Sequence, residues 1–319
     1  MIQHQLITKI EKNCASCKLS VDHTSLAFFP PGISFSGIHF NGGNPEATAV
    51  NAEIRNLSTD VSLRKFFSGE YDLENTQVTE PHVSVTEGDL RSVPSLNDES
   101  SSISFVVKDI HISDGIFSYT RFYGKKKGEL QVTHIQGLVG TVGSVPPYRD
   151  VASEGTITGQ LEHSGKVQLS VKMPVFEKDL NVDVSLQLLE QNLADTTPFF
   201  RADSGLTLTG LLIHGKSLMQ IRDKNLHGWV VAQYRDLKIS LEKTDDRSAL
   251  SAFFSNLLSS AKLVSSNVNH SHKDQVRSID LTRKERETPI QFILRGLRDA
   301  SLNIASNGTA AVRKAQKIK

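Results

Sequence analysis

The chain has 319 residues, with 36 Lys and Arg against 35 Asp and Glu, and a hydrophobic content of 38%. A formal net charge of +1 provides no general attraction to nucleic acid or to an anionic membrane, so composition indicates neither partner. The length allows one long β-domain or two ordinary domains. The modest hydrophobic content suits a sheet with one polar face better than a sheet buried on both faces.

The N-terminal segment predicts a short helix, because Ile2, Leu6 and Ile10 recur at helical spacing. The only cysteines, Cys14 and Cys17, follow as a C-x-x-C pair. There is no second ligand pair for zinc and no following histidine for haem attachment. The pair is therefore interpreted as a local disulfide or as two inert thiols, and no metal or cofactor is predicted.

A β-pattern is repeated in the first half of the chain. Alternating apolar residues in 33–40 and 49–57 resemble those in 103–112 and 128–138. Such self-similarity indicates stacked units that each leave an apolar face for the next to cover. Residues 28–32, Phe-Phe-Pro-Pro-Gly, predict a turn between strands. The sequence thus predicts a long sheet with one apolar face.

Period-two alternation is clearest in the second half, where it predicts strands with one apolar face, joined by short hairpins. The residues predicted to line that face are Val167, Leu169, Val171, Val182, Val184, Leu186, Leu206, Leu208, Leu237 and Ile239. For each of them, the competing interpretation is an ordinary core position under a helix or a second sheet.

Two amphipathic helices are predicted near the C-terminus. The apolar residues of the first are Leu250, Phe253, Phe254, Leu257 and Leu258. The second begins at Pro289, with Ile290, Ile293, Leu294 and Leu297 on one side. These helices would either plug the sheet face or form a lid over a bound chain, and the plug is the favoured interpretation.

The predicted fold class is mainly β: a long antiparallel meander with a few short helices. The predicted segments are an N-terminal β-unit with its leading helix (1–88), an acidic, serine-rich loop (89–102), a β-meander (103–245), amphipathic helices that pack on the sheet (246–305) and a basic disordered tail (306–319). No nucleophile elbow, P-loop, dinucleotide fingerprint or H-E-x-x-H motif occurs, so an enzyme is disfavoured.

Together these features resemble the AsmA-like proteins of the Gram-negative envelope. The likeness lies in the Pro-Pro-Gly turn and strand at 30–38, the Leu-Phe turn and glycine at 63–69, and the strand pair at 73–85 broken at Pro81. It continues in the Asp-Gly joint at 112–119 and a similar joint at 221–228. The resemblance covers residues 15–245.

The resemblance implies a twisted, taco-like β-groove that binds or transfers phospholipid or another acyl lipid in support of outer-membrane biogenesis and lipid homeostasis. It also implies a periplasmic location, an inner-membrane anchor helix that this sequence does not contain, and envelope proteins of both membranes as partners. Physically, shielding each methylene from water is worth about 0.8 kcal/mol, which an apolar face supplies without catalytic groups. The alternative is a structural or regulatory envelope scaffold whose apolar face is filled by its own helices.

Overall fold

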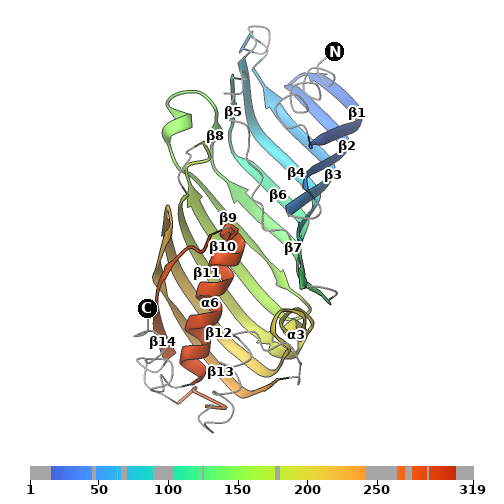
Figure 1. The fold of residues 1–319 in the computed structure, drawn as a ribbon. Helices are drawn as coiled ribbons and strands as arrows, with labels where there is room; N and C mark the ends of the chain where they lie inside the picture. The colour runs from blue at the N-terminus through green and yellow to red at the C-terminus, as the bar shows by residue number, and fades with distance from the viewer. Residues whose placement is uncertain are drawn as a thin grey trace. The chain divides into compact units, whose positions relative to one another are not determined.

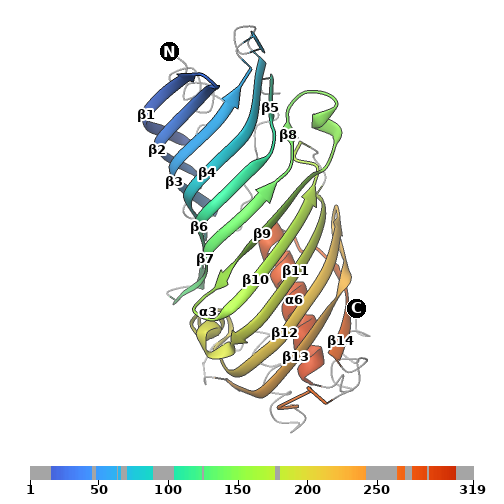
Figure 2. The same cartoon turned by 180° about the vertical axis from the view of Figure 1, so that it is seen from behind.

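The computed structural model of the protein describes residues 16–44, 48–62, 64–65, 70–88, 104–123, 126–176, 180–241, 264–269, 275–285 and 287–306. Within these residues the fold is mainly β, as predicted. The strands form one open, mostly antiparallel sheet of fourteen strands, accompanied by two short α-helices (Figures 1 and 2).

The strands are β1 (Lys18–Phe28), β2 (Pro31–Asn44), β3 (Thr48–Val61), β4 (Glu70–Glu87), β5 (Ser104–Val107), β6 (Ile110–Tyr123), β7 (Lys126–Val139), β8 (Val142–Gly143), β9 (Ser153–Leu161), β10 (Gly165–Met173), β11 (Asn181–Asn192), β12 (Leu206–Arg222), β13 (Asn225–Leu241) and β14 (Val276–Thr282). The helices are α3 (Thr197–Ser204) and α6 (Pro289–Ala305), with 3-10 turns η1 (Tyr148–Asp150) and η2 (Leu193–Thr196). The order in the sheet is β1-β2-β3-β4-β6-β7-β9-β10-β11-β12-β13-β14, with β5 beside β4 and β8 beside β5.

The sheet departs from the predicted antiparallel meander after β4. Strand β6 runs parallel to β4, and so does β5, which pairs with the first residues of β4. Period-two alternation shows which side chains share a face but contains no information on strand direction. The sequence pattern therefore could not predict these parallel pairs. The sequence repeat is not a structural repeat either, because 33–40 lie in β2 alone whereas 104–112 are divided between β5 and β6. Strand β14 lies within 246–305, where only helices were predicted.

The chain divides into two compact units, which are described separately. Unit 1 comprises Met1–Arg121, Gln131–Gly159 and Ser170–Val182. Unit 2 comprises Phe122–Leu130, Gln160–Leu169 and Asp183–Lys319. Helices α3 and α6 both belong to unit 2. Among the helices of the described ranges, none combines the length and hydropathy needed to cross a bilayer.

In unit 1 the predicted turn between β1 and β2 is confirmed at its centre. Phe28 pairs with Pro31, so Phe29 and Pro30 form the tip of a tight hairpin. Neither Pro30 nor Pro31 has a backbone N–H, and Gly32 follows where β2 begins. The composition that predicted the turn thus marks the point where the ladder between these strands ends.

In unit 2, α6 packs on β13 and β14 and covers one face of these strands, lying in front of them in Figure 1 and behind them in Figure 2. The helix begins at Pro289 as predicted, with Thr288 as its N-cap: the Gln291 N–H donates to the Thr288 hydroxyl at 3.2 Å.

The buried side of α6 differs from the predicted one. It is formed by Phe292, Gly296, Ala300 and Ile304, whereas Ile290, Ile293, Leu294 and Leu297 are only half-buried. Small residues decide the orientation, because a Cβ on Gly296 would lie 2.8 Å from the Cδ2 of Leu226 on β13. The helix therefore approaches the sheet through Gly296, a position that a hydropathy pattern does not mark as apolar.

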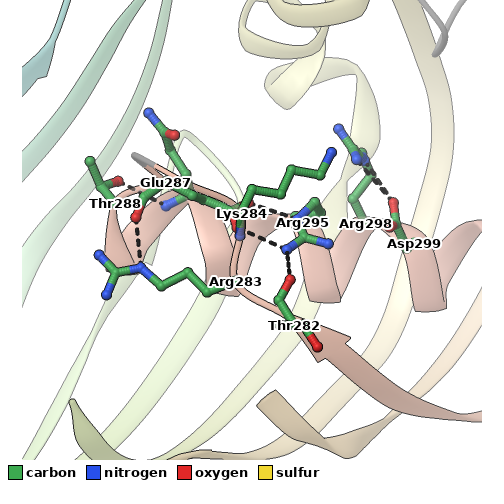
Figure 3. A network of polar contacts seen from close by, with 9 residues as sticks. Thr282, Arg283, Lys284, Glu287, Thr288, Arg295, Arg298 and Asp299 are labelled. Atoms are coloured by element: carbon green, nitrogen blue, oxygen red, sulfur yellow. Dashed lines mark hydrogen bonds and ion pairs between the residues drawn. The ribbon is translucent and has the colours of Figure 1, made fainter. Parts of the chain in front are cut away.

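A polar network fixes the first turns of α6 to the end of β14 (Figure 3). Arg295 forms hydrogen bonds to both carboxylate oxygens of Glu287, and its Nη2 also donates to the Thr282 carbonyl at 2.9 Å. Glu287 accepts a further bond from the Lys284 N–H at 2.9 Å. Burial alone would raise the pKa of Glu287, but the hydrogen bonds from Arg295 and the Lys284 N–H outweigh it and lower the pKa below its ordinary value.

Residues 264–269 lie along β13 beyond the end of β14. The Leu237 N–H donates to the Ser265 carbonyl at 2.8 Å, and the Asn267 N–H donates to the Tyr234 carbonyl at 3.1 Å. The buried Asn267 amide also donates to the Ala232 carbonyl at 2.8 Å and accepts from the Tyr234 N–H at 2.9 Å. This segment therefore satisfies backbone groups of β13 that β14 does not reach.

Candidate functional site

One face of unit 1 is apolar across β2, β3, β4 and β6. Directly paired residues share a face of a sheet, so the register identifies its members. One row runs through Phe35, Leu57, Val78 and Ile112, and a second row runs through Phe40, Ala52, Val83 and Phe117. We call these two rows the apolar face. Every side chain in them is half-buried.

The opposite face of the same strands is polar. Ser34, Ser58, Gln77 and His111 form a row beside the first apolar row, one residue out of phase with it. Each apolar side chain therefore has a polar neighbour in sequence that points to the other side. Unit 1 thus presents a two-sided sheet, with an apolar and a wet surface.

Left-handed backbone conformations bring the two apolar rows to one face. In unbroken alternation Phe35 and Phe40, an odd number of residues apart, would point to opposite sides. Gly37, Glu80 and Asp114 lie between the rows on β2, β4 and β6 and have φ of 61°, 49° and 53°. They mark the positions where the alternation changes phase across these strands.

Contacts with β7 show that the phase does change. A Cβ on Gly137 would lie 3.6 Å from the Cβ of Ile112, and a Cβ on Gly115 would lie 3.2 Å from the Cβ of Ile135. Ile135 and Gly137 are two residues apart and share a face, so Ile112 and Gly115 also share one. Phe117, two residues after Gly115, then lies on the same side as Ile112.

Sequence reasoning missed these residues as a site. It found apolar alternation on both sides of Gly37, but not the change of phase that unites the two stretches. It also took Asp114-Gly115 for a joint between strands, whereas both residues lie inside β6. The face could have been predicted from a residue type that readily adopts a left-handed backbone conformation, placed between two alternating stretches of opposite phase.

The face predicted in the second half of the chain lies mostly in unit 2. On β12 and β13, Leu208 pairs with Ile239 and Leu206 pairs with Leu241. Register shifts between Thr209 and Leu211 and between Leu212 and His214 each add one residue to a strand. These bulges place Leu208 and Ile239 on the side of Ile221 and Leu226, which also pair with each other.

The other predicted lining residues divide between the two units. Val167, Leu169, Val184 and Leu186 belong to unit 2, whereas Val171 and Val182 belong to unit 1. Val182, Val184, Leu206 and Leu237 are buried, and Val167, Leu169, Val171, Leu186, Leu208 and Ile239 are half-buried. The part of the unit 2 face around Leu226 is an ordinary core under α6, since Leu226 meets Gly296 and is fully buried.

Several predicted features lie outside the described residues: Leu250, Phe253, Phe254, Leu257 and Leu258 of the first amphipathic helix, the loop at 89–102, and Cys14. Cys17 is disulfide-bonded, and Cys14 is the only other cysteine of the sequence. In the part of the chain that the structure describes, no group of three or more His, Cys, Asp and Glu side chains is arranged to hold a metal ion.

Two buried hydroxyls interrupt the unit 2 face. Ser217 and Tyr234 are both buried, and neither side-chain oxygen has a hydrogen-bond partner. Burial raises the pKa of Tyr234 to about 12, with a smaller opposing effect from Arg277. The hydroxyls weaken this core, because a buried polar group without a partner costs about 1–3 kcal/mol.

No protein-family model matches the chain, and no curated protein shows significant sequence similarity to it.

Proposed function

We propose that the chain is a non-catalytic lipid-binding protein whose unit 1 sheet holds acyl chains on its apolar face. In keeping with the AsmA-like resemblance of its sequence, we place it in the periplasm, where it binds or transfers phospholipid for outer-membrane biogenesis and lipid homeostasis. Inner- and outer-membrane envelope proteins are its proposed partners.

The half-buried state of the apolar face carries the proposal. Leu226, which α6 covers in unit 2, and its pairing partner Ile221 are fully buried, whereas the rows through Phe35 and Phe40 keep part of their surface accessible. Helices α3 and α6 both belong to unit 2, where α3 packs on β12 and α6 packs on β13 and β14. An apolar surface left in this state is a site for an apolar ligand.

The dimensions of the apolar face suit acyl chains. Four strands at about 4.8 Å spacing make the rows roughly 14 Å wide, and five residues at about 3.3 Å place the two rows roughly 16 Å apart along the strands. Covering this surface with hydrocarbon gains about 25 cal/mol for each Å² removed from water. No polar catalyst is needed for such binding.

The second candidate function is a structural or regulatory scaffold whose apolar surface is filled by its own helices. The packing of α6 on β13 and β14 favours it for unit 2, where Phe292 and Ile304 are buried. The two functions differ in their prediction for unit 1, because a scaffold would leave the apolar face without a lipid ligand.

The test is native mass spectrometry of the full chain purified in mild detergent, with lipid extraction of the same sample. Leu57→Asp places a charge on the apolar face, and Ser58→Asp places the same charge on the opposite face one residue away. The proposal predicts co-purifying acyl lipid with the wild type and Ser58→Asp, and its loss with Leu57→Asp. A folded, lipid-free wild type would refute lipid binding and favour the scaffold.

A second pair of variants locates the lipid within the chain. Leu169→Asp changes a half-buried residue of the unit 2 face, and Lys166→Asp changes an exposed residue of the same strand. Lipid retention in both would assign binding to unit 1. Loss in Leu169→Asp alone, with Leu57→Asp retaining lipid, would move the site to unit 2.

A further inference from the structure

The tip of the β1–β2 hairpin is the most exposed apolar feature of the described residues. Phe29 is 98% exposed, Phe28 68% and Leu26 55%. A folded chain rarely leaves two adjacent phenylalanines in water unless they meet a partner, since each would gain from burial. The hairpin itself is regular, with Leu26 opposite Ile33 and Phe28 opposite Pro31.

We propose that this hairpin tip docks on the surface of a lipid bilayer by inserting Phe28 and Phe29 among the lipid head groups and upper acyl chains. The inference rests on the proposed function only in naming what the docking serves, which is access of acyl chains to the apolar face.

The charge distribution of the hairpin favours a bilayer. Residues 24–36 contain no charged side chain, whereas Asp22 and His23 precede them. From His23 to Phe28 the strand extends about 16 Å, which is comparable to half of a bilayer's hydrocarbon thickness of about 30 Å. Thus no ionised group of the hairpin itself has to leave water when the tip enters the head-group region.

The backbone of the tip limits the depth of insertion. Pro30 and Pro31 have no N–H, so the turn has two fewer backbone donors to satisfy when it leaves water. Strand β1 lies at the end of the strand order and pairs only with β2 among the described strands. A strand edge that pairs with no further strand is costly to bury in hydrocarbon, so only the turn inserts and β1 stays in the interface.

Charged side chains near this end of unit 1 already have polar or oppositely charged partners. Gly32 at the base of the turn pairs with Asp60, which accepts from the Asn75 amide at 2.8 Å. Lys108 bridges Asp72 and Glu74, at 3.1 Å and 2.6 Å. Docking therefore depends on the aromatic tip, and it should need neither anionic lipid nor low salt.

The tip is also continuous with the apolar face. Leu26 pairs with Ile33, which is two residues before Phe35 on β2, and no left-handed residue lies between them. Leu26, Ile33 and Phe35 therefore share one side of the sheet. The exposed Leu26 and the half-buried Phe35 therefore lie on the same side of the sheet, with the buried Ile33 between them.

The experiment is flotation of the full chain with vesicles of phosphatidylcholine, alone or mixed with phosphatidylglycerol, at low and high salt. The variant combines Phe28→Ser with Phe29→Ser. Its control is Leu138→Ser, because Leu138 is a 50% exposed residue of β7. We expect the wild type and control to bind both vesicles at both salt concentrations, and the double variant to bind on the order of tenfold more weakly or less.

Phe29→Trp gives an independent readout, because its fluorescence should shift to the blue with vesicles relative to the wild type, which has only Trp229. A wild type that does not float, or that binds only anionic vesicles at low salt, would overturn the proposal and leave the tip to a protein partner. A double variant that binds like the wild type would overturn it as well.

The two proposals fail separately. Vesicle binding that depends on Phe28 and Phe29 supports docking even when no lipid co-purifies with the chain, and lipid binding then fails alone. Co-purifying lipid in a chain that does not bind vesicles overturns docking and leaves lipid binding intact.

Discussion

The guanidinium of Arg295 holds the carboxylate of Glu287 through two parallel hydrogen bonds, 2.7 Å from Nε to Oε1 and 2.8 Å from Nη2 to Oε2. Their side chains are only 10% and 9% exposed, and the Arg295 guanidinium also lies 5.3 Å from the centre of the Phe292 ring. Because Arg295 also donates to the Thr282 carbonyl, the pair links the start of α6 to the end of β14.

Arg295→Met should lower the free energy of unfolding by about 3 kcal/mol, because it leaves a buried carboxylate without its counter-charge. Urea unfolding followed by circular dichroism measures the loss. Lys166→Met is the matched control, since Lys166 and Glu190 form an ion pair of similar length between exposed side chains, and its cost should stay below about 0.5 kcal/mol. Equal costs for the two variants would contradict a structural role for the Arg295–Glu287 pair.

The same pair predicts acid sensitivity. The pKa of Glu287 is lower in the folded than in the unfolded chain, so its contribution to stability is complete above 4.5, the ordinary pKa of a glutamate. The contribution is lost as the pH falls from there through the folded value, because the unfolded state then binds the proton more readily. Glu287→Gln should be less stable than the wild type at neutral pH and approach it in acid. A constant difference across this range would be inconsistent with the mechanism.

Gly296→Ala should destabilise unit 2 by about 1 kcal/mol, although alanine is the better helix former. The added Cβ would lie 2.8 Å from the Cδ2 of the fully buried Leu226, so one of the two must shift. Ser301→Ala at an exposed position of α6 should instead stabilise by a few tenths of a kcal/mol, up to about 0.5. Thermal unfolding of both variants tests the sign, and a stabilised Gly296→Ala chain would show that α6 does not approach the sheet closely.

Removing the hydroxyl group of two buried tyrosines should change the free energy of unfolding in opposite directions. Tyr119 donates to the buried Glu87 carboxylate at 2.5 Å, so Tyr119→Phe should cost about 2 kcal/mol. Tyr234 has no partner, so Tyr234→Phe should stabilise by about 1 kcal/mol. Chemical unfolding measures both changes, and a loss of stability in Tyr234→Phe would show that its hydroxyl is satisfied.

The raised pKa of Tyr234 predicts that the folded protein loses stability in alkali. Its folded pKa of about 12 lies above the ordinary value of 10.0, so its contribution is complete below pH 10 and is lost as the pH rises toward 12. Tyr234→Phe should reduce this decline, whereas Leu218→Ala at an exposed position of β12 should leave it unchanged.

The fold class could be predicted from the sequence because alternation and turn composition are local. Phe28 to Gly32 marks a hairpin by its residue types alone, and Pro289 marks the start of α6. The buried side of α6 could not be predicted from hydropathy. Gly296 is buried because its lack of a side chain lets the helix lie close to the sheet, and a hydropathy pattern does not register this.

The candidate site was only partly predictable for a related reason. Period-two reading identifies a face only while the phase is constant, and Gly37 and Asp114 sit where it changes. Similarly, Leu208 and Ile239 join the side of Leu226 through bulges that depend on the pairing of two strands. The phase of alternation in each strand depends on its pairing with neighbouring strands, and the pattern of a single strand does not contain this information.

The most direct test of the central claim is photo-crosslinking from two neighbouring positions of β2. A photoreactive p-benzoylphenylalanine replaces Phe35 on the apolar face in one sample and Ser34 on the polar face in the other, and mass spectrometry identifies the adducts after irradiation in cells. Binding of acyl chains on the apolar face predicts a lipid adduct from position 35 and none from position 34. No lipid adduct at position 35, or equal adducts at both positions, would contradict it.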